Sequence, residues 1–195
     1  MINDRGVVSG FSSFYNSGGK HKTKIDGKHT VPYKTWHDMV RRCYRPSGSE
    51  QARVYSGCTI SSEWLDYQDF AEWYEGNKFK GDEYHLDKDI LIAGNKVYSP
   101  AFCRLVPRDI NNLLTDSKRA RGVYPQGVSY KKSNNRFVSQ IKRYGEVCHL
   151  GLFDTPNEAY QVYKLAKEDY VKSVANKWAD FIDKDTYSSL INWSL

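Results

Sequence analysis

The sequence predicts an α+β protein with two folded units, and three observations support this class. Residues 85–115 follow the order strand, loop, strand, helix. Residues 127–153 contain three short alternating segments followed by a helical pattern, so we expect a small three-stranded antiparallel sheet packed on one helix. The 195 residues are 39% hydrophobic and 14% aromatic, which is sufficient for folded cores.

Composition shifts divide the chain into three parts. Residues 1–30 are rich in Gly, Ser, Lys and His and lack periodicity, so this arm is either extended or packed at an edge of the fold. A polar, basic and aperiodic stretch at 116–122 predicts the boundary between the units. We therefore expect an N-terminal arm over 1–30, a first unit over 31–117 and a second unit with a C-terminal tail over 118–195.

The first unit is expected to begin with two helices and a short strand. Four apolar residues at helical spacing predict an amphipathic helix over 33–44. Residues 58–60 are typical of a short strand, and Ser61 or Ser62 can cap a second helix that starts near Glu63. The dense aromatic residues of this second helix recur at helical spacing, which favours core packing over stacking on bases.

The next stretch carries the residues best suited to chemistry. His85, Asp87 and Asp89 alternate with a mostly apolar set, so a strand places three candidate ligands or bases on one face. A Gly-Asn turn breaks the chain, and residues 102–106 predict a second strand. Pro107 fits the first turn of a helix that carries two asparagines.

The same stretch contains a series of motifs. They are Leu86-Asp87-Lys88, Asn95, Tyr98-Ser99-Pro100, Cys103-Arg104 and Asn111 or Asn112, preceded by TWHDMVRRCY at 35–44 and by Glu63-Trp64. This series resembles the core of phage HNH endonucleases, including homing endonucleases. The resemblance implies a ββα-metal fold and metal-dependent hydrolysis of double-stranded DNA, by nicking one strand or cutting both.

The resemblance also implies roles for individual residues. Asp87 together with Asn111 or Asn112 would bind Mg²⁺ or Mn²⁺, and Asp89 is a further candidate ligand. Asn95 would belong to the catalytic core.

Lys88 departs from the family pattern. It stands where most HNH enzymes place the histidine that activates water, and a protonated lysine cannot accept a proton. His85, on the same face as Asp87, is therefore the candidate general base, and Lys88 would contact the scissile phosphate.

Two alternatives remain open for this stretch. Asp87 and Asp89 can instead cap turns or pair with Lys88, Lys96 and Arg104 at the surface. The absence of the expected histidine also fits a catalytically inactive DNA-binding protein derived from an HNH nuclease.

The second unit has clear strand and helix signals. Three short strands are predicted at 127–132, 136–143 and 147–153. Thr155 as the cap, Pro156 after it and Glu158 three residues beyond the cap predict a capping box at the start of a helix.

This pattern carries the motifs Gly-Val, Arg-Phe-Val-Ser-Gln-Ile, Leu-Gly-Leu-Phe-Asp-Thr and Glu-Ala. They resemble the plant ethylene-response-factor, or Apetala-type, DNA-binding domain, which implies that the sheet enters the major groove of DNA. The candidate groove-facing residues are Tyr130, Lys132, Arg136, Val138, Gln140 and Lys142, or the opposite set with Lys131 and Arg143 if the register shifts by one residue.

Charge is unevenly distributed along the chain. Residues 118–145 contain eight Lys or Arg residues and no Asp or Glu, in a chain with a formal charge of +6. Such a patch fits nucleic acid, whereas a solvated basic face or an acidic protein partner is the alternative.

Composition also bears on location and metal content. No apolar run approaches the roughly 20 residues that cross a bilayer, and no signal peptide is evident, so we expect a cytoplasmic protein, in the host cell if it is phage-encoded. The four cysteines form no Cys-x-x-Cys pair, which favours buried free thiols over a structural Zn²⁺ site. The apolar tail after residue 172 is expected to pack back on a domain, in a monomer or a homodimer.

Overall fold

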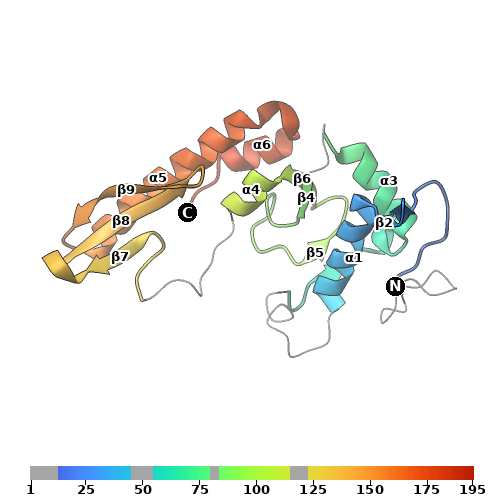
Figure 1. The fold of residues 1–195 in the computed structure, drawn as a ribbon, viewed down its shortest axis with the longest axis horizontal. Coiled ribbons are helices and arrows are strands. Elements are labelled where there is room, and N and C mark those ends of the chain that lie inside the picture. Colours follow the sequence, from blue (N-terminus) through green and yellow to red (C-terminus); the bar gives the residue numbers. More distant parts are fainter. Residues whose placement is uncertain (1–12, 45–54, 80–83, 115–122) are drawn as a thin grey trace. The chain divides into compact units, whose positions relative to one another are not determined.

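A computed structural model describes residues 13–44, 55–79, 84–114 and 123–195. The chain forms two compact units, Met1–Asn111 and Asn112–Leu195, and each combines helices with small sheets (Figure 1). The protein is therefore of the α+β class. The boundary expected at 116–122 lies outside the described residues.

Two helices organise the first unit. Helix α1 (Val31–Tyr44) begins slightly before its predicted start and carries a proline in its first turn. Helix α3 (Tyr67–Asn77) begins after Asp66, whose carboxylate accepts a hydrogen bond from the backbone N–H of Gln68 at 3.0 Å. The expected cap at Ser61 or Ser62 is wrong, because the chain first forms a 3₁₀ turn, η1 (Ser62–Trp64), and Asp66 caps the α-helix instead.

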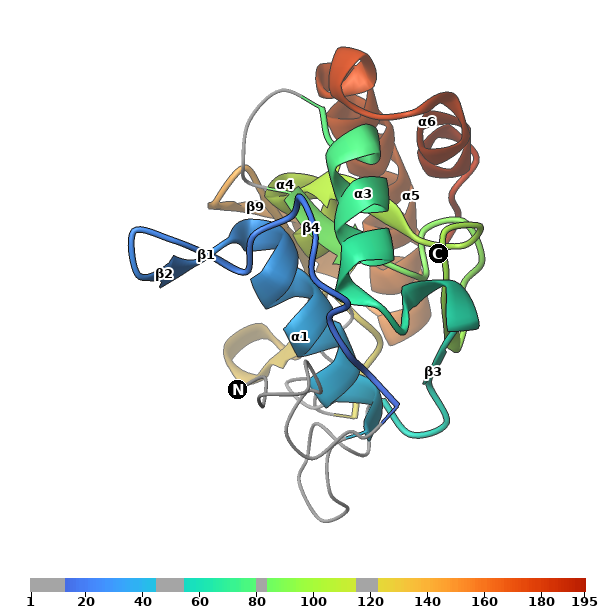
Figure 2. The same ribbon diagram turned by 90° about the vertical axis from the view of Figure 1, so that its right-hand side faces the viewer.

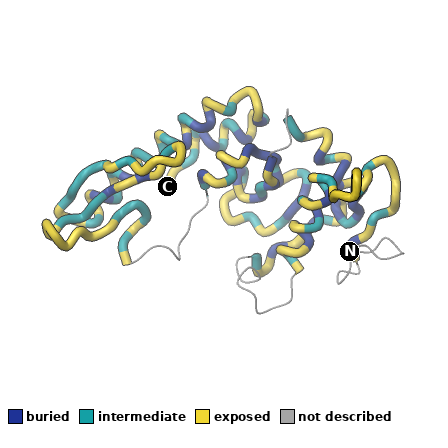
Figure 3. Tube along the Cα trace, in the orientation of Figure 1, coloured by how far each residue is buried: buried dark blue, intermediate teal, exposed yellow. Residues whose placement is uncertain are grey.

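Aromatic side chains fill the core between these helices. Trp36 is completely buried, and its indole Nε1–H donates to the carbonyl of Trp64 at 2.8 Å. The rings of Tyr33 and Tyr67 meet edge to face, with centroids 5.4 Å apart. Buried residues gather along the contact of α1 with α3 (Figure 3). The aromatic stripe is therefore core, as its helical spacing predicts.

Two small sheets complete the core of the first unit. One joins β3 (Thr59–Ile60) and β5 (Val97–Tyr98) in parallel, and the other joins β4 (Tyr84–Asp87) and β6 (Arg104–Pro107) in antiparallel fashion. Helix α4 (Arg108–Leu113) follows directly. The expectation that Pro107 opens this helix is wrong by one residue: Pro107 ends β6 opposite Tyr84, where a strand tolerates a missing N–H.

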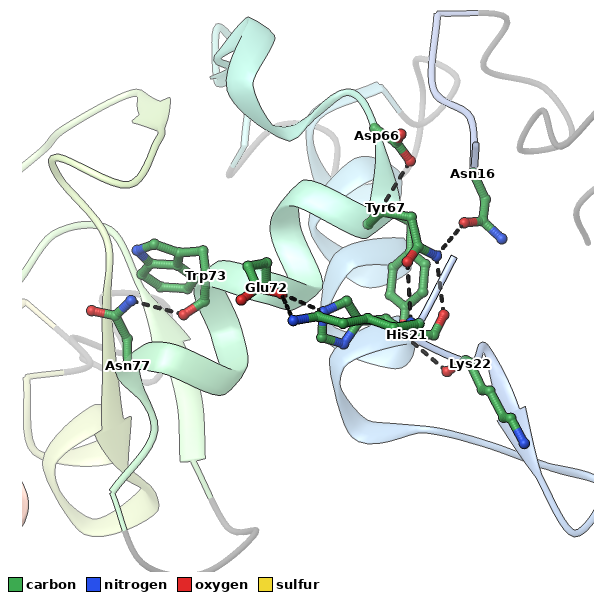
Figure 4. A network of polar contacts seen from close by, with 10 residues as sticks. Asn16, His21, Lys22, Asp66, Tyr67, Glu72, Trp73 and Asn77 are labelled. Carbon is green, nitrogen blue, oxygen red and sulfur yellow. Dashed lines mark hydrogen bonds and ion pairs between the residues drawn. The ribbon is translucent and has the colours of Figure 1, made fainter. Parts of the chain in front are cut away.

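Residues 13–30 form part of the first unit and are anchored to its core at several points. Phe14 is buried, and the backbone of Tyr15 exchanges two hydrogen bonds with residues 65 and 67. The side-chain amide of Gln68 is hydrogen-bonded to Asn16 and to the backbone of His21. Figure 4 shows Asn16 and His21 within this polar network. A short hairpin follows, formed by β1 (Lys24–Ile25) and β2 (Lys28–His29).

The second unit is a three-stranded antiparallel sheet in the order β7-β8-β9, packed on a long helix. Its elements are β7 (Val128–Lys131), η3 (Lys132–Asn134), β8 (Arg136–Arg143), β9 (Glu146–Phe153) and α5 (Pro156–Lys177). The predicted capping box is present: Thr155 Oγ1 accepts from the N–H of Glu158, and Glu158 Oε2 accepts from the N–H of Thr155, each at 3.2 Å.

Close packing fixes the helix against the sheet. Gly127 precedes β7 with φ +76°, and a Cβ built there would lie 1.9 Å from the buried ring of Tyr163 on α5. A glycine is therefore required both by the backbone conformation and by the helix.

The C-terminal tail packs back on α5. After η4 (Ala179–Phe181), helix α6 (Lys184–Ile191) buries Leu190, and the N–H of Leu195 donates to Glu168 on α5 at 3.1 Å. Across the described part of the chain, none of the helices has the length and apolar character needed to traverse a bilayer.

Candidate metal site and nucleic-acid interface

Strand β4 separates polar from buried residues as the alternation predicts. His85 is exposed and Asp87 is half-buried, whereas the neighbouring Leu86 and Lys88 are 8% exposed each. The strand ends at Asp87, and Asp89 lies in the bend that follows, so the alternation of the strand does not fix the direction of its side chain. His85 and Asp87 therefore share one side of β4.

The Asp87 carboxylate is held by the backbone of that bend. Its Oδ1 accepts hydrogen bonds from the N–H groups of Asp89 at 2.7 Å and Ile90 at 2.8 Å. Among the described residues, Oδ2 accepts no hydrogen bond. Burial raises the pKa of Asp87, and the two N–H donors offset part of this rise. Asp87 therefore caps the bend with Oδ1, as one of the two alternatives predicts, and Oδ2 remains available to a ligand.

Lys88 is tied into the loop between β4 and β5. Its ammonium donates to both carboxylate oxygens of Asp89, at 2.8 and 2.7 Å, and to the carbonyl of Asn95 at 2.5 Å. A cation this deeply buried must be paired, and here both the charge and the donors are used. The expected contact of Lys88 with a scissile phosphate is replaced by a structural contact.

Asn95 closes the same loop from its other end. Its Nδ2 donates to the carbonyls of Lys88 and Val97, each at 2.8 Å, and its Oδ1 accepts from the N–H of Val97 at 3.0 Å. Lys88 and Asn95 thus bond each other in both directions. Both amide hydrogens of Asn95 and one acceptor position of its Oδ1 thus hold the loop in place.

Helix α4 supplies the two asparagines expected as ligands. Asn111 is half-buried and Asn112 is exposed. Adjacent residues on an α-helix point about 100° apart, so they cannot both face the same ion. Asn112 also belongs to the second unit, which leaves Asp87 and Asn111 as the pair within the first.

The oxygen atoms of Asp87 and of the helix asparagines are ligands of the kind that Mg²⁺ binds. Mg²⁺ retains several waters and needs only one or two protein oxygens, and carboxylate and amide oxygens are the kinds of ligand it accepts. Asp89 fits less well, because both of its oxygens already bind the ammonium of Lys88. In the described ranges, no three His, Cys, Asp or Glu side chains cluster as a metal-binding group.

The cysteines have the character of buried thiols. Burial raises the pKa of Cys43 and of Cys103 to about 12 each, so both stay protonated at neutral pH. Protonated, buried thiols of this kind behave as small apolar side chains.

The register of the second-unit sheet defines which residues share a face. Lys131 lies opposite Arg136, and Gln140 and Lys142 continue the same side of β8. Ser139 and Ile141, on the alternate side, are buried, and β8 packs on α5. The open face of the sheet, defined here as Lys131, Arg136, Val138, Gln140 and Lys142, is the candidate nucleic-acid interface.

Three expected DNA-contact residues lie elsewhere. Tyr130 pairs with Phe137, and their rings lie 5.2 Å apart on the side opposite to the open face, so its assignment to that face is wrong. Lys132 is exposed but leaves the strand for η3. Arg143 turns to α5, where its Nη2 donates to the carbonyl of Ala166 at 2.6 Å.

Arg136 is on the open face but is not free of partners. Its Nε donates to Asp154 Oδ1 at 3.0 Å, an ion pair whose two side chains are 41% and 80% exposed. Lys131, Gln140 and Lys142 are exposed, and their side chains have no hydrogen-bond or ion-pair partner among the described residues. These three are the most available polar groups of the sheet.

The structural role of Lys88 could have been predicted from its position in the strand pattern, although its place in the HNH-like motif suggests a catalytic role. Leu86, Lys88 and Ile90 occupy the buried parity of the strand pattern, and a charged residue at such a position requires a partner. The partner, Asn95, is separated from it by a whole loop and is not identified by periodicity.

Comparisons with known proteins do not extend these observations. No protein-family model, no curated protein and no solved structure matches the chain.

Proposed function

We propose that the chain is a metal-dependent DNA endonuclease of the ββα-metal type, which nicks or cuts double-stranded DNA. The observation that carries this proposal is the Asp87 carboxylate. One of its oxygens is fixed by two backbone N–H groups, and by the alternation of the strand its side chain shares one side of β4 with His85. A strand pair followed directly by α4 supplies the element order of that fold.

The division of roles follows from the side chains. Asp87 and Asn111 would hold Mg²⁺ or Mn²⁺, which when bound stabilises the charge on the scissile phosphate and the leaving oxygen. The exposed imidazole of His85, when neutral, can accept a proton from water at an unprotonated ring nitrogen. Lys88 and Asn95 keep the loop after β4 in place. The open face of β7-β8-β9 would bind and orient the duplex.

A second candidate function is DNA binding without cleavage. Lys88 favours it, because a buried and fully paired lysine occupies the position at which the resembled enzymes carry the water-activating histidine. In that case Asp87 serves only as the cap of the bend. The two functions predict the same affinity for DNA and different behaviour with metal.

Cleavage of supercoiled plasmid DNA separates the two functions. We expect nicking with Mg²⁺ or Mn²⁺ and none with EDTA. Asp87→Asn retains an oxygen that can cap the bend but loses the charge, so cleavage should fall at least 100-fold, as for loss of a metal ligand. His85→Ala should fall about 100-fold or more, the usual contribution of a general base.

Asp38→Asn is the matched control, because in the described part of the chain this exposed carboxylate on α1 makes one long contact, to Arg41 at 3.4 Å. It should cleave as the wild type does. Wild-type protein that binds DNA and leaves it intact with every metal would support the binding-only function.

A further inference from the structure

The β1–β2 hairpin is a feature to which no role has yet been assigned. Lys24 pairs with His29 and Ile25 with Lys28, and Asp26 and Gly27 form the turn with φ of 49° and 74°. Two positive φ values are typical of a type I′ turn, which matches the twist of the strands. Strands this short do not form a stable hairpin alone, so the structure depends on how its base is held.

The base of the hairpin is anchored to the core. The carbonyl of Lys22 accepts hydrogen bonds from Tyr67 Oη at 3.1 Å and from Thr30 Oγ1 at 3.0 Å. The ring of His29 stacks on the buried Tyr33 with centroids 4.7 Å apart. Figure 4 shows the side chain of Lys22 directed away from this network, and in Figure 2 the hairpin extends beyond α1. The tip is thus presented on a fixed stem.

The charge of the tip is not neutralised. Residues 20–34 contain five lysines and a single acidic residue, Asp26. Lys20 is paired with Glu72 at 2.5 Å, whereas Lys22, Lys24 and Lys28 are exposed and form no ion pair with a described residue. Three unpaired ammonium groups on a fixed stem create a local positive potential.

The two lysines of the strands point to opposite sides. Successive residues of a strand alternate between faces, so Lys24 and His29 share one face, while Ile25 and Lys28 share the other. On the first face His29 packs on Tyr33, but the side chain of Lys24 beside it is exposed, and Lys28 is exposed on the other face next to the turn. Exposed cations on the two sides of a thin ribbon suit a space that has negative charge on both walls. A groove of duplex DNA offers this arrangement, with one phosphate row on each side, and the major groove is wide enough for two strands.

We propose that the β1–β2 hairpin is a second DNA-contact element, in which Lys24 and Lys28 bind phosphates on opposite walls of one groove. The proposal takes its ligand, duplex DNA, from the proposed function, but it concerns a surface of the first unit and is independent of the metal site. Flat acidic surfaces, such as an anionic membrane, would engage one face of the ribbon and leave the other cation unused.

The test is the salt dependence of duplex binding, measured by fluorescence anisotropy with the full chain. Log K falls as log salt concentration rises, and each phosphate contact contributes about 0.9 to the steepness of this fall. Lys24→Gln/Lys28→Gln should therefore make the slope shallower by about 1.8 and weaken binding roughly tenfold at low salt. Each single variant should account for about half of the change. The matched control Lys172→Gln/Lys184→Gln removes the same charge from exposed positions on α5 and α6 and should leave the slope unchanged.

The outcomes distinguish this proposal from the proposed function. If the wild type binds the duplex and the hairpin variant binds equally well, the hairpin proposal fails and the proposed function stands. If one lysine accounts for the whole effect, the two-walled geometry is wrong. Hairpin-dependent binding to phosphatidylglycerol vesicles, without a change in DNA binding, would overturn the choice of partner. Unchanged circular dichroism confirms that each variant is folded.

Discussion

Strands β4 and β8 place cations in two different settings. Lys88 follows β4 on its buried side and Arg143 ends β8 on the side of α5, and the charge of each is met by nearby carboxylates and carbonyls. Lys142, one residue before Arg143, is exposed and has no described partner. In both strands, the side to which a charged side chain points decides whether it binds other groups of the protein or is exposed to a partner.

The same contrast applies to the two candidate sites. Around β4, hydrogen bonds between described residues occupy Lys88, Asn95 and one oxygen of Asp87, whose other oxygen accepts none from them. On the open face of the sheet, Lys131, Gln140 and Lys142 have no hydrogen-bond or ion-pair partner within the described ranges. The first arrangement suits a small ion in a fixed position, and the second suits an extended polyanion.

The largest effect is expected from breaking the loop after β4. Asn95→Ala removes three hydrogen bonds and leaves the carbonyl of Lys88 without its donor, which should lower the free energy of unfolding by about 2–4 kcal/mol. Lys88→Met removes the donor to the Asn95 carbonyl and should cost about 1–3 kcal/mol. Urea unfolding followed by circular dichroism measures both.

Asn77→Ala is a suitable control, because the amide of Asn77 is exposed and, among the described residues, makes one hydrogen bond, to the carbonyl of Trp73 at 2.7 Å. It should change stability by less than about 1 kcal/mol. An Asn95→Ala protein as stable as this control would show that the loop does not depend on its asparagine.

Substitution of Asp87 should have a smaller effect on the free energy of unfolding, and this effect should depend on pH. Burial raises its pKa in the folded state, so the folded protein retains a proton that the unfolded chain has already lost. Stability is therefore reduced as pH rises from the usual carboxylate range through the folded-state pKa. Asp87→Asn lacks this titration, so it should be more stable relative to the wild type at pH 7 than at pH 4.

Urea unfolding of the wild type and of Asp87→Asn at the two pH values measures this difference. A relative stability that is the same at pH 4 and pH 7 would mean that burial does not disfavour the carboxylate. Together with the cleavage assay, the result would show a residue retained for its charge at a cost in stability.

The sequence predicts elements whose signals are local. The capping box of Thr155 and Glu158 marks the start of α5, and the alternation around Asp87 marks β4, because each depends on neighbours within one turn or one strand. The β1–β2 hairpin is not among the predicted elements, because residues 1–30 as a whole are polar and aperiodic, although Asp26-Gly27 is by itself a local turn signal.

Features that depend on contacts between residues distant in the sequence are harder to predict from the sequence. The cap of α3 is Asp66, which also accepts a hydrogen bond from the N–H of Ser17, and that contact depends on the packing of the N-terminal segment. The side of the sheet on which Tyr130 lies depends on the length of η3, which sets the register of β7 against β8. Lys88 and Asn95 meet only once the loop closes.

The smallest effects are expected from adjacent residues at the end of β8. Arg143→Gln removes the bond to the Ala166 carbonyl and should lower stability by about 1 kcal/mol, while the salt dependence of DNA binding stays as in the wild type. Lys142→Gln should change stability by less than about 0.5 kcal/mol and reduce the salt slope by about 0.9. Each variant removes one positive charge from the same strand, so net charge cannot explain a difference between them. If both reduce the slope equally, binding follows total charge, and the face on which a cation lies has no bearing on contact with DNA.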